Sequence, residues 1–303
     1  MKEELVSVII PNKDHTEDLD KAIRSTLEKG TWKNLEFIVV ENNSEEPETF
    51  EYYKRLQQEY PQVKVVVYDG PFNYSRINNF GVQYASGRYI LLMNNDVELI
   101  NPDSIREMMG YCQRDDVGIV GCRLMYEDDT LQHAGVIVGI QGIADHAFKG
   151  KSLNEPIYFS RAMIAQDYSA VTAAVLLTKR EVYDAVNGLD ETFEVAFNDI
   201  DFCLRVRQTG KLVVYNPYAS FYHYESKSRG LEDNADKIRR FHGEIYRFAT
   251  RYFDFMEKGD PMYNPNLSII RNDFSLRNLY QSKVGQPFYT KEQLEELLVD
   301  IEP

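Results

Sequence analysis

The chain has little of several things that mark whole classes of protein. It holds only three cysteines among 303 residues, Cys112, Cys122 and Cys203. They lack the paired spacing of a zinc site and cannot all pair as disulfides, so we expect reduced thiols in a cytoplasmic protein. With 34 Lys and Arg against 48 Asp and Glu, the formal net charge is −14. Such acidity argues against broad nucleic-acid binding and against a polybasic membrane anchor.

Long apolar runs and nucleotide-binding glycine motifs are also missing. No stretch is long enough to span a bilayer, and the first residues, MKEELVSVIIPNKD, lack the apolar length and cleavage site of a signal peptide. The chain has no G-x-G-x-x-G after its first apolar run and no G-x-x-x-x-G-K-[ST] anywhere. These gaps argue against a dinucleotide oxidoreductase and a P-loop NTPase.

The first hundred residues alternate short apolar runs with segments of helical period. Because strand and helix patterns alternate, we expect an α/β protein with a mostly parallel central sheet and helices on both faces. Strands are predicted at 6–10, 37–40, 63–68 and 89–93, and helices at 19–27, 50–60 and 74–85, the first capped by Asp14 or Thr16.

The second half is less regular, and we expect hairpins and loops over 121–165. A long aromatic-rich helix at about 234–256 and another at 291–300 predict a helical C-terminal extension. The remaining strands are predicted at 117–120, 173–178, 212–215 and 219–222, and the remaining helices at 179–187 and 201–209.

The run YILLMNNDVELINP, residues 89–102, is the most informative stretch of the chain. A buried strand ends abruptly in two asparagines and Asp96, which places a carboxylate at the rim of the sheet. Ligands of open α/β sheets bind at the carboxyl ends of strands. Mg²⁺ or Mn²⁺ is often held there by one or two carboxylates together with substrate phosphates. The alternative is a strand-to-loop turn with a solvated aspartate.

Other strands end in polar residues at the same predicted rim. Pro11 and Asn12 follow the first strand, Asn43 follows the second, and Asn95 stands beside Asp96. We expect these four residues to line a nucleotide site, in which a carboxylate contacts the base and a metal ion the diphosphate.

Five segments in order carry a resemblance that none of them carries alone. They are VSVIIPNKD, FIVVENNS, FNYSRINNFGVQYASGRYILLMNNDVE, GLDETFEVAFNDIDFCLRVRQTG and FYHYESKSRG. Across residues 5–230 the chain resembles family 2 glycosyltransferases, and more narrowly the bacterial branch that includes rhamnosyltransferases of surface polysaccharide assembly. The resemblance implies a GT-A catalytic domain at 1–230, with a nucleotide-binding half at 1–100 and an acceptor-binding half at 101–230. A helical extension follows at 231–303.

The resemblance also implies roles for acidic residues and one histidine. Asp96 matches the metal-binding position of the family's D-X-D motif, although its first position here is Asn94. His223 matches a histidine that completes the metal site, while a structural hydrogen bond is the alternative. Glu41 stands where the family has an aspartate that contacts the donor base, which favours a UDP- or dTDP-linked sugar. A solvated turn carboxylate is the alternative for Glu41.

The catalytic base implied by the resemblance is Asp199, in the segment AFNDIDF, where Asn198 replaces the glutamate of the family's Glu-Asp motif. An inverting transfer needs one carboxylate to deprotonate the acceptor hydroxyl. The alternative is that Asp199 or Asp201 only caps the following helix.

Two further groups of residues are candidates for contacts with the nucleotide. Asn73, Ser75 and Asn78 open the helix before the fourth strand, and they either bind the nucleotide or cap that helix. Lys227 and Arg229 suit a diphosphate, or else belong to a solvated loop.

Together these features predict a metal-dependent inverting glycosyltransferase that moves a hexose or deoxyhexose, such as rhamnose, onto a glycan or a lipid-linked saccharide. The rival readings are a nucleotidyltransferase and a catalytically silent module that binds glycans or nucleotides. We expect a cytoplasmic protein that is either free or peripheral at the inner face of the membrane. The helix near 234–256 would contact the bilayer, the core of the protein or a second subunit of a homodimer.

Overall fold

The structure is a computed structural model, and it describes residues 2–155, 157–225, 234–277 and 289–299. Four parallel strands form one side of its main sheet, in the order β3-β2-β1-β4. They are β1 (Val6–Asn12), β2 (Leu35–Glu41), β3 (Val63–Val67) and β4 (Tyr89–Met93). The helices between them are α1 (Thr16–Arg24), which continues as a π-helical turn (Ser25–Lys29), α2 (Pro47–Glu59) and α3 (Tyr74–Val82).

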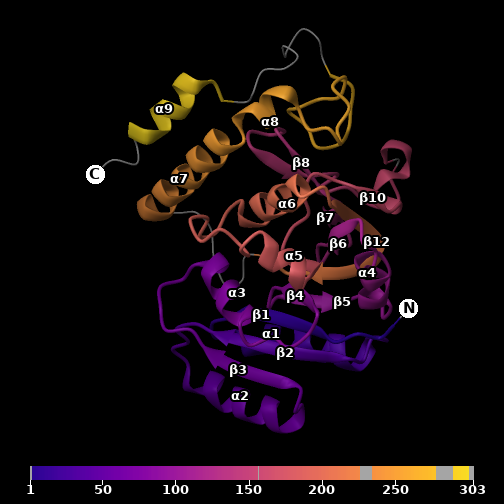
Figure 1. Cartoon of the computed structure of the whole chain (residues 1–303), viewed down its shortest axis with the longest axis vertical. Coiled ribbons are helices and arrows are strands. Elements are labelled where there is room, and N and C mark those ends of the chain that lie inside the picture. Colours follow the sequence, from indigo (N-terminus) through magenta and orange to yellow (C-terminus); the bar gives the residue numbers. More distant parts are fainter. Residues whose placement is uncertain (1, 156, 226–233, 278–288, 300–303) are drawn as a thin grey trace.

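The second half of the chain extends the same sheet past β4 (Figure 1). β11 (Val175–Lys179) lies antiparallel between β4 and β6 (Val117–Met125), and β12 (Leu212–His223) then runs parallel to β6. Shorter strands are β5 (Val97–Leu99), β7 (Leu131–His133), β8 (Val136–Val138), β9 (Ala144–His146) and β10 (Gln166–Asp167). The helices of this half are α4 (Ser104–Cys112), the 3₁₀ segment Tyr158–Met163, α5 (Arg180–Ala185) and α6 (Asn198–Gln208).

Three local predictions were wrong. β12 is one strand and not two, because an irregularity between Asn216 and Ser220 bends it without breaking the pairing with β6. The helix expected at 234–256 is divided at Tyr252 into α7 (Ala235–Arg251) and α8 (Phe253–Lys258). Neither Asp14 nor Thr16 caps α1, because the N-cap position is His15 and no side chain makes a capping hydrogen bond there. The carboxylate of Asp14 accepts hydrogen bonds from the backbone N–H groups of residues 45 and 46 and thereby holds the start of α2.

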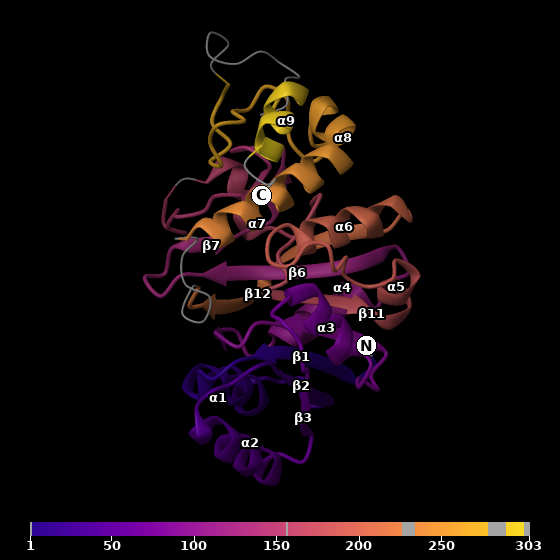
Figure 2. The same cartoon turned by 90° about the vertical axis from the view of Figure 1, so that its left-hand side faces the viewer.

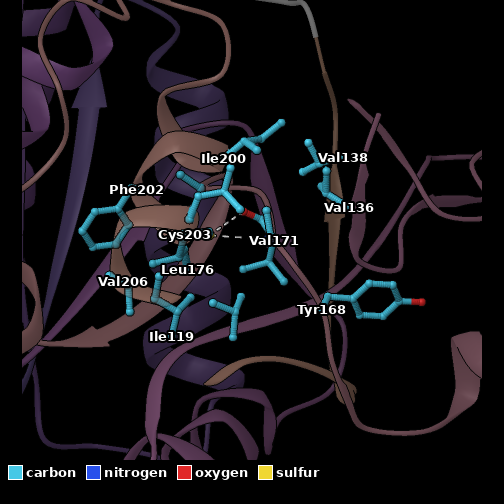
Figure 3. Packing of buried hydrophobic residues seen from close by; sticks show 14 of the residues in the cluster. Ile119, Val136, Val138, Tyr168, Val171, Leu176, Ile200, Phe202, Cys203 and Val206 are labelled. Atoms are coloured by element: carbon cyan, nitrogen blue, oxygen red, sulfur yellow. Dashed lines mark hydrogen bonds between the residues drawn. The ribbon is translucent and has the colours of Figure 1, made fainter. Parts of the chain in front are cut away.

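Apolar side chains of successive strand residues point to opposite faces of the sheet, as the period of a strand requires. Ile9, Leu92 and Leu176 belong to one hydrophobic cluster, and their chain neighbours Leu91 and Val175 to the other. Continuous apolar runs therefore fit strands buried on both faces. Figure 3 shows the first cluster between α6 and the sheet.

The helical extension adds its own side chains to the first cluster. Ile245, Phe248 and Ala249 of α7 are buried there, and Phe241 stacks on Phe197 with 5.9 Å between ring centroids. Figures 1 and 2 show α7, α8 and α9 (Lys291–Val299) at the end of the molecule opposite α2 and β3. The apolar side of α7 thus packs on the core. Within the described ranges, no helix combines the length and the apolarity that crossing a membrane requires.

Candidate functional site

A cavity of about 650 Å³ opens at the carboxyl ends of β1, β2 and β4. Its first wall holds Pro11, Asn12, Asn43, Asn95 and Asp96, which are five of the predicted site residues. The opposite wall comes from the second half of the chain, α7 included. Its polar members are Gln132, Asp145, His146, Lys149, Thr172, Asn198, Asp199, His223, Glu225, Lys237 and Arg240. The topology therefore brings together residues more than two hundred positions apart in the chain.

A buried hydrogen-bond chain behind the first wall of the cavity joins the ends of β1, β2 and β4. Asn95 Nδ2 donates to Asn12 Oδ1 over 2.7 Å, and Asn12 Nδ2 donates to the Tyr53 hydroxyl over 2.8 Å. Tyr53 in turn donates to Glu41 over 2.6 Å. Such a satisfied network fixes the amides of Asn12 and Asn95 rigidly at the cavity surface.

The structure does not place Glu41 on the cavity, where contact with the base would require it. Its side chain is only 2% exposed, and its carboxylate accepts hydrogen bonds from Tyr53 and from the backbone N–H and hydroxyl of Ser44. These donors turn the carboxylate inward. Asn42 and Asn43, the next two residues, line the cavity instead.

Asp96 and His223 lie side by side, with 3.2 Å between Asp96 Oδ1 and His223 Nε2. His223 Nδ1 faces Gln132 Oε1 at 2.6 Å and must donate its hydrogen to that acceptor. Asn94 Nδ2 lies 3.2 Å from His223 Nε2 and can donate to the single lone pair of that nitrogen when no metal ion is bound. A nitrogen lone pair and a carboxylate oxygen then face each other at 3.2 Å.

When the imidazole is neutral, this nitrogen and this carboxylate oxygen together form a donor set that suits a divalent metal ion. Among the residues that the structure describes, no group of three or more His, Cys, Asp or Glu side chains could hold a metal. Two protein ligands leave the remaining coordination positions to phosphate oxygens and water.

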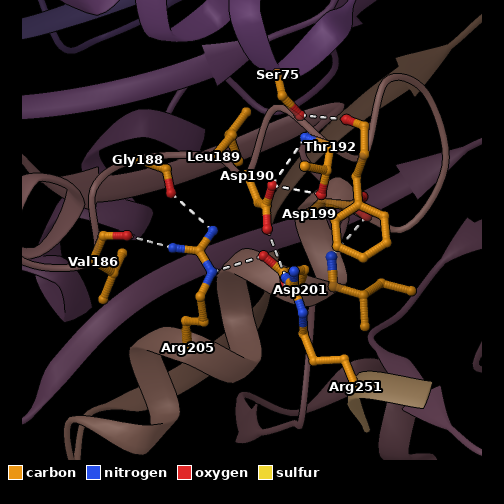
Figure 4. A network of polar contacts seen from close by, with 12 residues as sticks. Ser75, Val186, Gly188, Leu189, Asp190, Thr192, Asp199, Asp201, Arg205 and Arg251 are labelled. Atoms are coloured by element: carbon orange, nitrogen blue, oxygen red, sulfur yellow. Dashed lines mark hydrogen bonds and ion pairs between the residues drawn. The ribbon is translucent and has the colours of Figure 1, made fainter. Parts of the chain in front are cut away.

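Asp199 and Asp201 have separate surroundings (Figure 4). Asp199 lines the cavity, and its two oxygens accept hydrogen bonds from the backbone N–H groups of Ala173 and Ile200, over 3.0 and 2.8 Å. Asp201 is fully buried on the other side of α6, where it pairs with Arg205 and Arg251. Of the two carboxylates, Asp199 is the one that a ligand in the cavity can reach.

Asn73, Ser75 and Asn78 are buried away from the cavity. Asn73 caps α3 by accepting from the N–H of Arg76 over 2.9 Å, and Ser75 donates to the carbonyl of Phe193 over 2.6 Å. Asn78 donates to the carbonyl of Tyr74 within the helix. The three side chains start α3 and tie it to the segment before α6. Lys227 and Arg229 lie outside the described residues.

Sequence reasoning missed several members of the site. Gln132, Lys149, Lys237 and Arg240 belong to no recognisable motif, yet all four line the cavity. His146 also lines the cavity, and burial lowers the pKa of its imidazole. Tyr74 crosses the cavity floor: its hydroxyl lies 3.2 Å from Asn94 Oδ1 and 3.0 Å from the carbonyl of Ala173.

Comparison with known proteins supports a relationship over most of the chain. The sequence profile described as glycosyl transferase family 2 matches residues 7–170. Uncharacterized protein y4gI of Sinorhizobium fredii is 44% identical over 273 residues, which are 90% of this chain and 30% of that protein. The O-antigen biosynthesis protein RfbC of Myxococcus xanthus is 36% identical over 275 residues, 90% of this chain and 21% of RfbC. The chain thus spans less than a third of the length of these two relatives.

Two solved structures share the fold. GalNAc-T7, determined with UDP, GalNAc and Mn²⁺, aligns with a TM-score of 0.65 and 11% identity, over 84% of this chain and 50% of that one. The mannosyltransferase PcManGT of Pyrobaculum calidifontis, determined with GDP-Man and Mn²⁺, aligns with a TM-score of 0.58 and 13% identity, over 82% and 64%. At these identities the likeness shows the fold, which is GT-A as predicted.

Proposed function

The chain belongs to glycosyl transferase family 2, and we propose that it transfers a hexose or deoxyhexose from a nucleotide diphosphate to a glycan acceptor during synthesis of a surface polysaccharide. One observation carries the proposal: Asp96 and His223 share a cavity with Asp199. RfbC is named for O-antigen biosynthesis, which supports a surface polysaccharide as the product. A lipid-linked saccharide at the inner membrane face is the acceptor we propose, reached by a cytoplasmic protein.

We assign the donor diphosphate to the side of the cavity that holds Asp96 and His223. These two residues would hold Mg²⁺ or Mn²⁺, which when bound neutralises charge on the leaving nucleoside diphosphate. Asn12 and Asn95 present rigid amides beside it. The distance of 3.2 Å between Asp96 Oδ1 and His223 Nε2 would let both atoms bind the same cation.

The nucleotide base lies, in this proposal, at the outer end of the first wall near Asn43. Asn43 Nδ2 donates to the carbonyl of Gly70 over 2.8 Å, so its amide oxygen can accept the N3–H of uracil or thymine. Asn43 then takes the part expected of Glu41, and UDP or dTDP remains the proposed carrier.

Asp199 acts as the general base. It takes the proton of the acceptor hydroxyl while that oxygen bonds to the anomeric carbon, and the bond from that carbon to the diphosphate oxygen breaks on the opposite face. The configuration at the anomeric carbon inverts. The two backbone N–H donors on Asp199 hold the carboxylate in one orientation, as positioning of a base demands.

Calorimetric titration tests the donor site. UDP, dTDP and GDP are titrated with and without Mn²⁺ or Mg²⁺ into the parent, Asp96→Ala and the control Asp115→Ala, which alters an exposed carboxylate at the far end of β6. We expect metal-dependent binding of UDP or dTDP that only Asp96→Ala loses. Binding of GDP alone would overturn the proposed base contact.

Measurement of turnover distinguishes a glycosyltransferase from the two alternative functions, a silent binding module and a nucleotidyltransferase. If donor binds but is neither hydrolysed nor transferred, and Asp199→Asn behaves as the parent does, the protein is a silent binding module. Release of pyrophosphate from a nucleoside triphosphate would identify a nucleotidyltransferase.

A further inference from the structure

Gln132 is buried behind the Asp96–His223 pair and contacts His223 at two points. Its side chain is 2% exposed, and its Oε1 lies 2.6 Å from His223 Nδ1. Its Nε2 donates to the backbone carbonyl of His223 over 3.1 Å and to Glu225 Oε2 over 3.3 Å. Each end of the amide therefore has its own partner.

These partners allow only one orientation of the amide. The carbonyl of His223 and the carboxylate of Glu225 are both acceptors, so the NH₂ group must face them. Oε1 then faces His223 Nδ1, which has to carry a hydrogen in order to donate. In the neutral imidazole the lone pair is consequently on Nε2, the nitrogen that faces Asp96.

The backbone at Gln132 is shaped for this contact. Leu131 and His133 of β7 pair with the adjacent residues Met125 and Leu124 of β6, so Gln132 is one extra residue between two successive pairs. This is the geometry of a β-bulge, which re-aims a side chain and is frequent beside active sites. The bulge turns Gln132 toward His223.

We propose that Gln132, oriented by Glu225, is a positioning residue that holds His223 in the Nδ1–H tautomer and so leaves the lone pair on Nε2, where a divalent cation would bind. The inference rests on the proposed function, since it assigns His223 to the metal. Outer partners of ligating histidines fix the tautomer and the ring orientation, and their loss typically costs about 10- to 100-fold in metal affinity.

The test uses the whole chain and three variants. Gln132→Met keeps the length of the side chain but removes both the acceptor and the donor. Gln132→Glu sets a second carboxylate against Glu225. The double variant Gln132→Glu/Glu225→Gln restores one donor and one acceptor with the roles exchanged, so that residue 132 again accepts from His223.

Two measurements are made on ¹⁵N-histidine-labelled protein. The first is the tautomer of His223 without metal at alkaline pH, read from its ring nitrogen shifts. The second is the MnCl₂ concentration at which the His223 resonances broaden halfway. We expect a single Nδ1–H tautomer in the parent, mixed tautomers in Gln132→Met, and a half-broadening concentration about 10- to 100-fold higher in that variant. The double variant should recover most of both.

The outcomes separate the inference from the function. An unchanged tautomer and a Mn²⁺ response within about twofold of the parent in Gln132→Met would overturn the role of Gln132 while leaving the metal site intact. If the parent and Asp96→Ala respond equally to Mn²⁺, the metal site itself is wrong. If Gln132→Met fails to fold, the double variant Gln132→Glu/Glu225→Gln provides the test. Absence of the Nδ1–H tautomer of His223 in that variant would also refute the inference.

Discussion

Replacing Asp201 by Asn is expected to destabilise the fold far more than the same change at Asp199. Asp201 is fully buried and accepts from Arg205 over 2.7 Å, from Arg251 over 2.6 Å and from the Tyr252 hydroxyl over 2.7 Å. Removing one partner of a buried ion pair costs about 3–5 kcal/mol, because the remaining charge stays desolvated.

The lower end of that range applies here. An asparagine can still accept one hydrogen bond at the site, and Arg251 retains Asp190 as a partner at 2.7 Å. We therefore expect a loss of about 3 kcal/mol, which for a chain of this size lowers the midpoint of thermal unfolding by about 5 °C.

Asp199→Asn is the matched control on the same helix. The oxygens of Asp199 face the cavity and accept hydrogen bonds from two backbone N–H groups. The amide oxygen of asparagine can still accept one of these two hydrogen bonds. We expect a change in stability within about 1 kcal/mol and a fall in turnover of about 10²- to 10⁴-fold, the usual contribution of a general base. Thermal unfolding and donor turnover are measured for both variants. Equal midpoints, or a larger loss of turnover in Asp201→Asn at a temperature where both are folded, would refute the assignment.

Three further results are expected. Burial alone would raise the pKa of Asp190, but hydrogen bonds from Thr192 and Arg251 outweigh it and lower the pKa to about 2. Because this carboxyl binds fewer protons in the folded state, its contribution to stability is present above the unfolded pKa and is lost as pH falls from about 4 to 2. The free energy of unfolding of Asp190→Asn, measured with urea, should therefore fall less steeply than that of the parent over this pH range. Glu244→Ala removes the carboxylate that accepts from the N–H groups of Val195 and Ala196, in the loop before Asp199. Turnover should fall about 10- to 100-fold while affinity for the sugar-nucleotide is kept, and a loss of sugar-nucleotide binding would contradict this. Asn73→Ala should cost about 1 kcal/mol as a lost helix cap while leaving UDP affinity within twofold, and a large drop in affinity would restore Asn73 to the nucleotide site.

Local pattern predicted most of the architecture correctly. The strand at Tyr89–Met93 has the predicted bounds, and β1 to β4 run parallel, as the alternation of short apolar runs with helical segments predicted. These features depend on residues near one another in the chain, so periodicity reveals them. The ends of those strands also identified Asn12, Asn95 and Asp96 as neighbours, since parallel strands end at one rim.

Long-range packing decided which polar side chains face the cavity. Asp199 and Asp201 are two positions apart on a helix, about 200° around its axis, so they must face different ways, but the pattern does not say which one faces inward. Glu41 follows its strand as Asp96 does, yet Tyr53 on α2 and Ser44 bind its carboxylate and turn it away.

By itself, then, the sequence determined the sheet, its rim and the chemical character of that rim, because apolar period and strand ends are local properties. Only the tertiary structure decided that Gln132 stands behind His223, that Glu244 of α7 holds the loop before Asp199, and that Asp201 is structural. Each of these contacts joins residues separated by about 50 to 90 positions, and a hydrogen bond over that separation exists only once the helices and strands have packed.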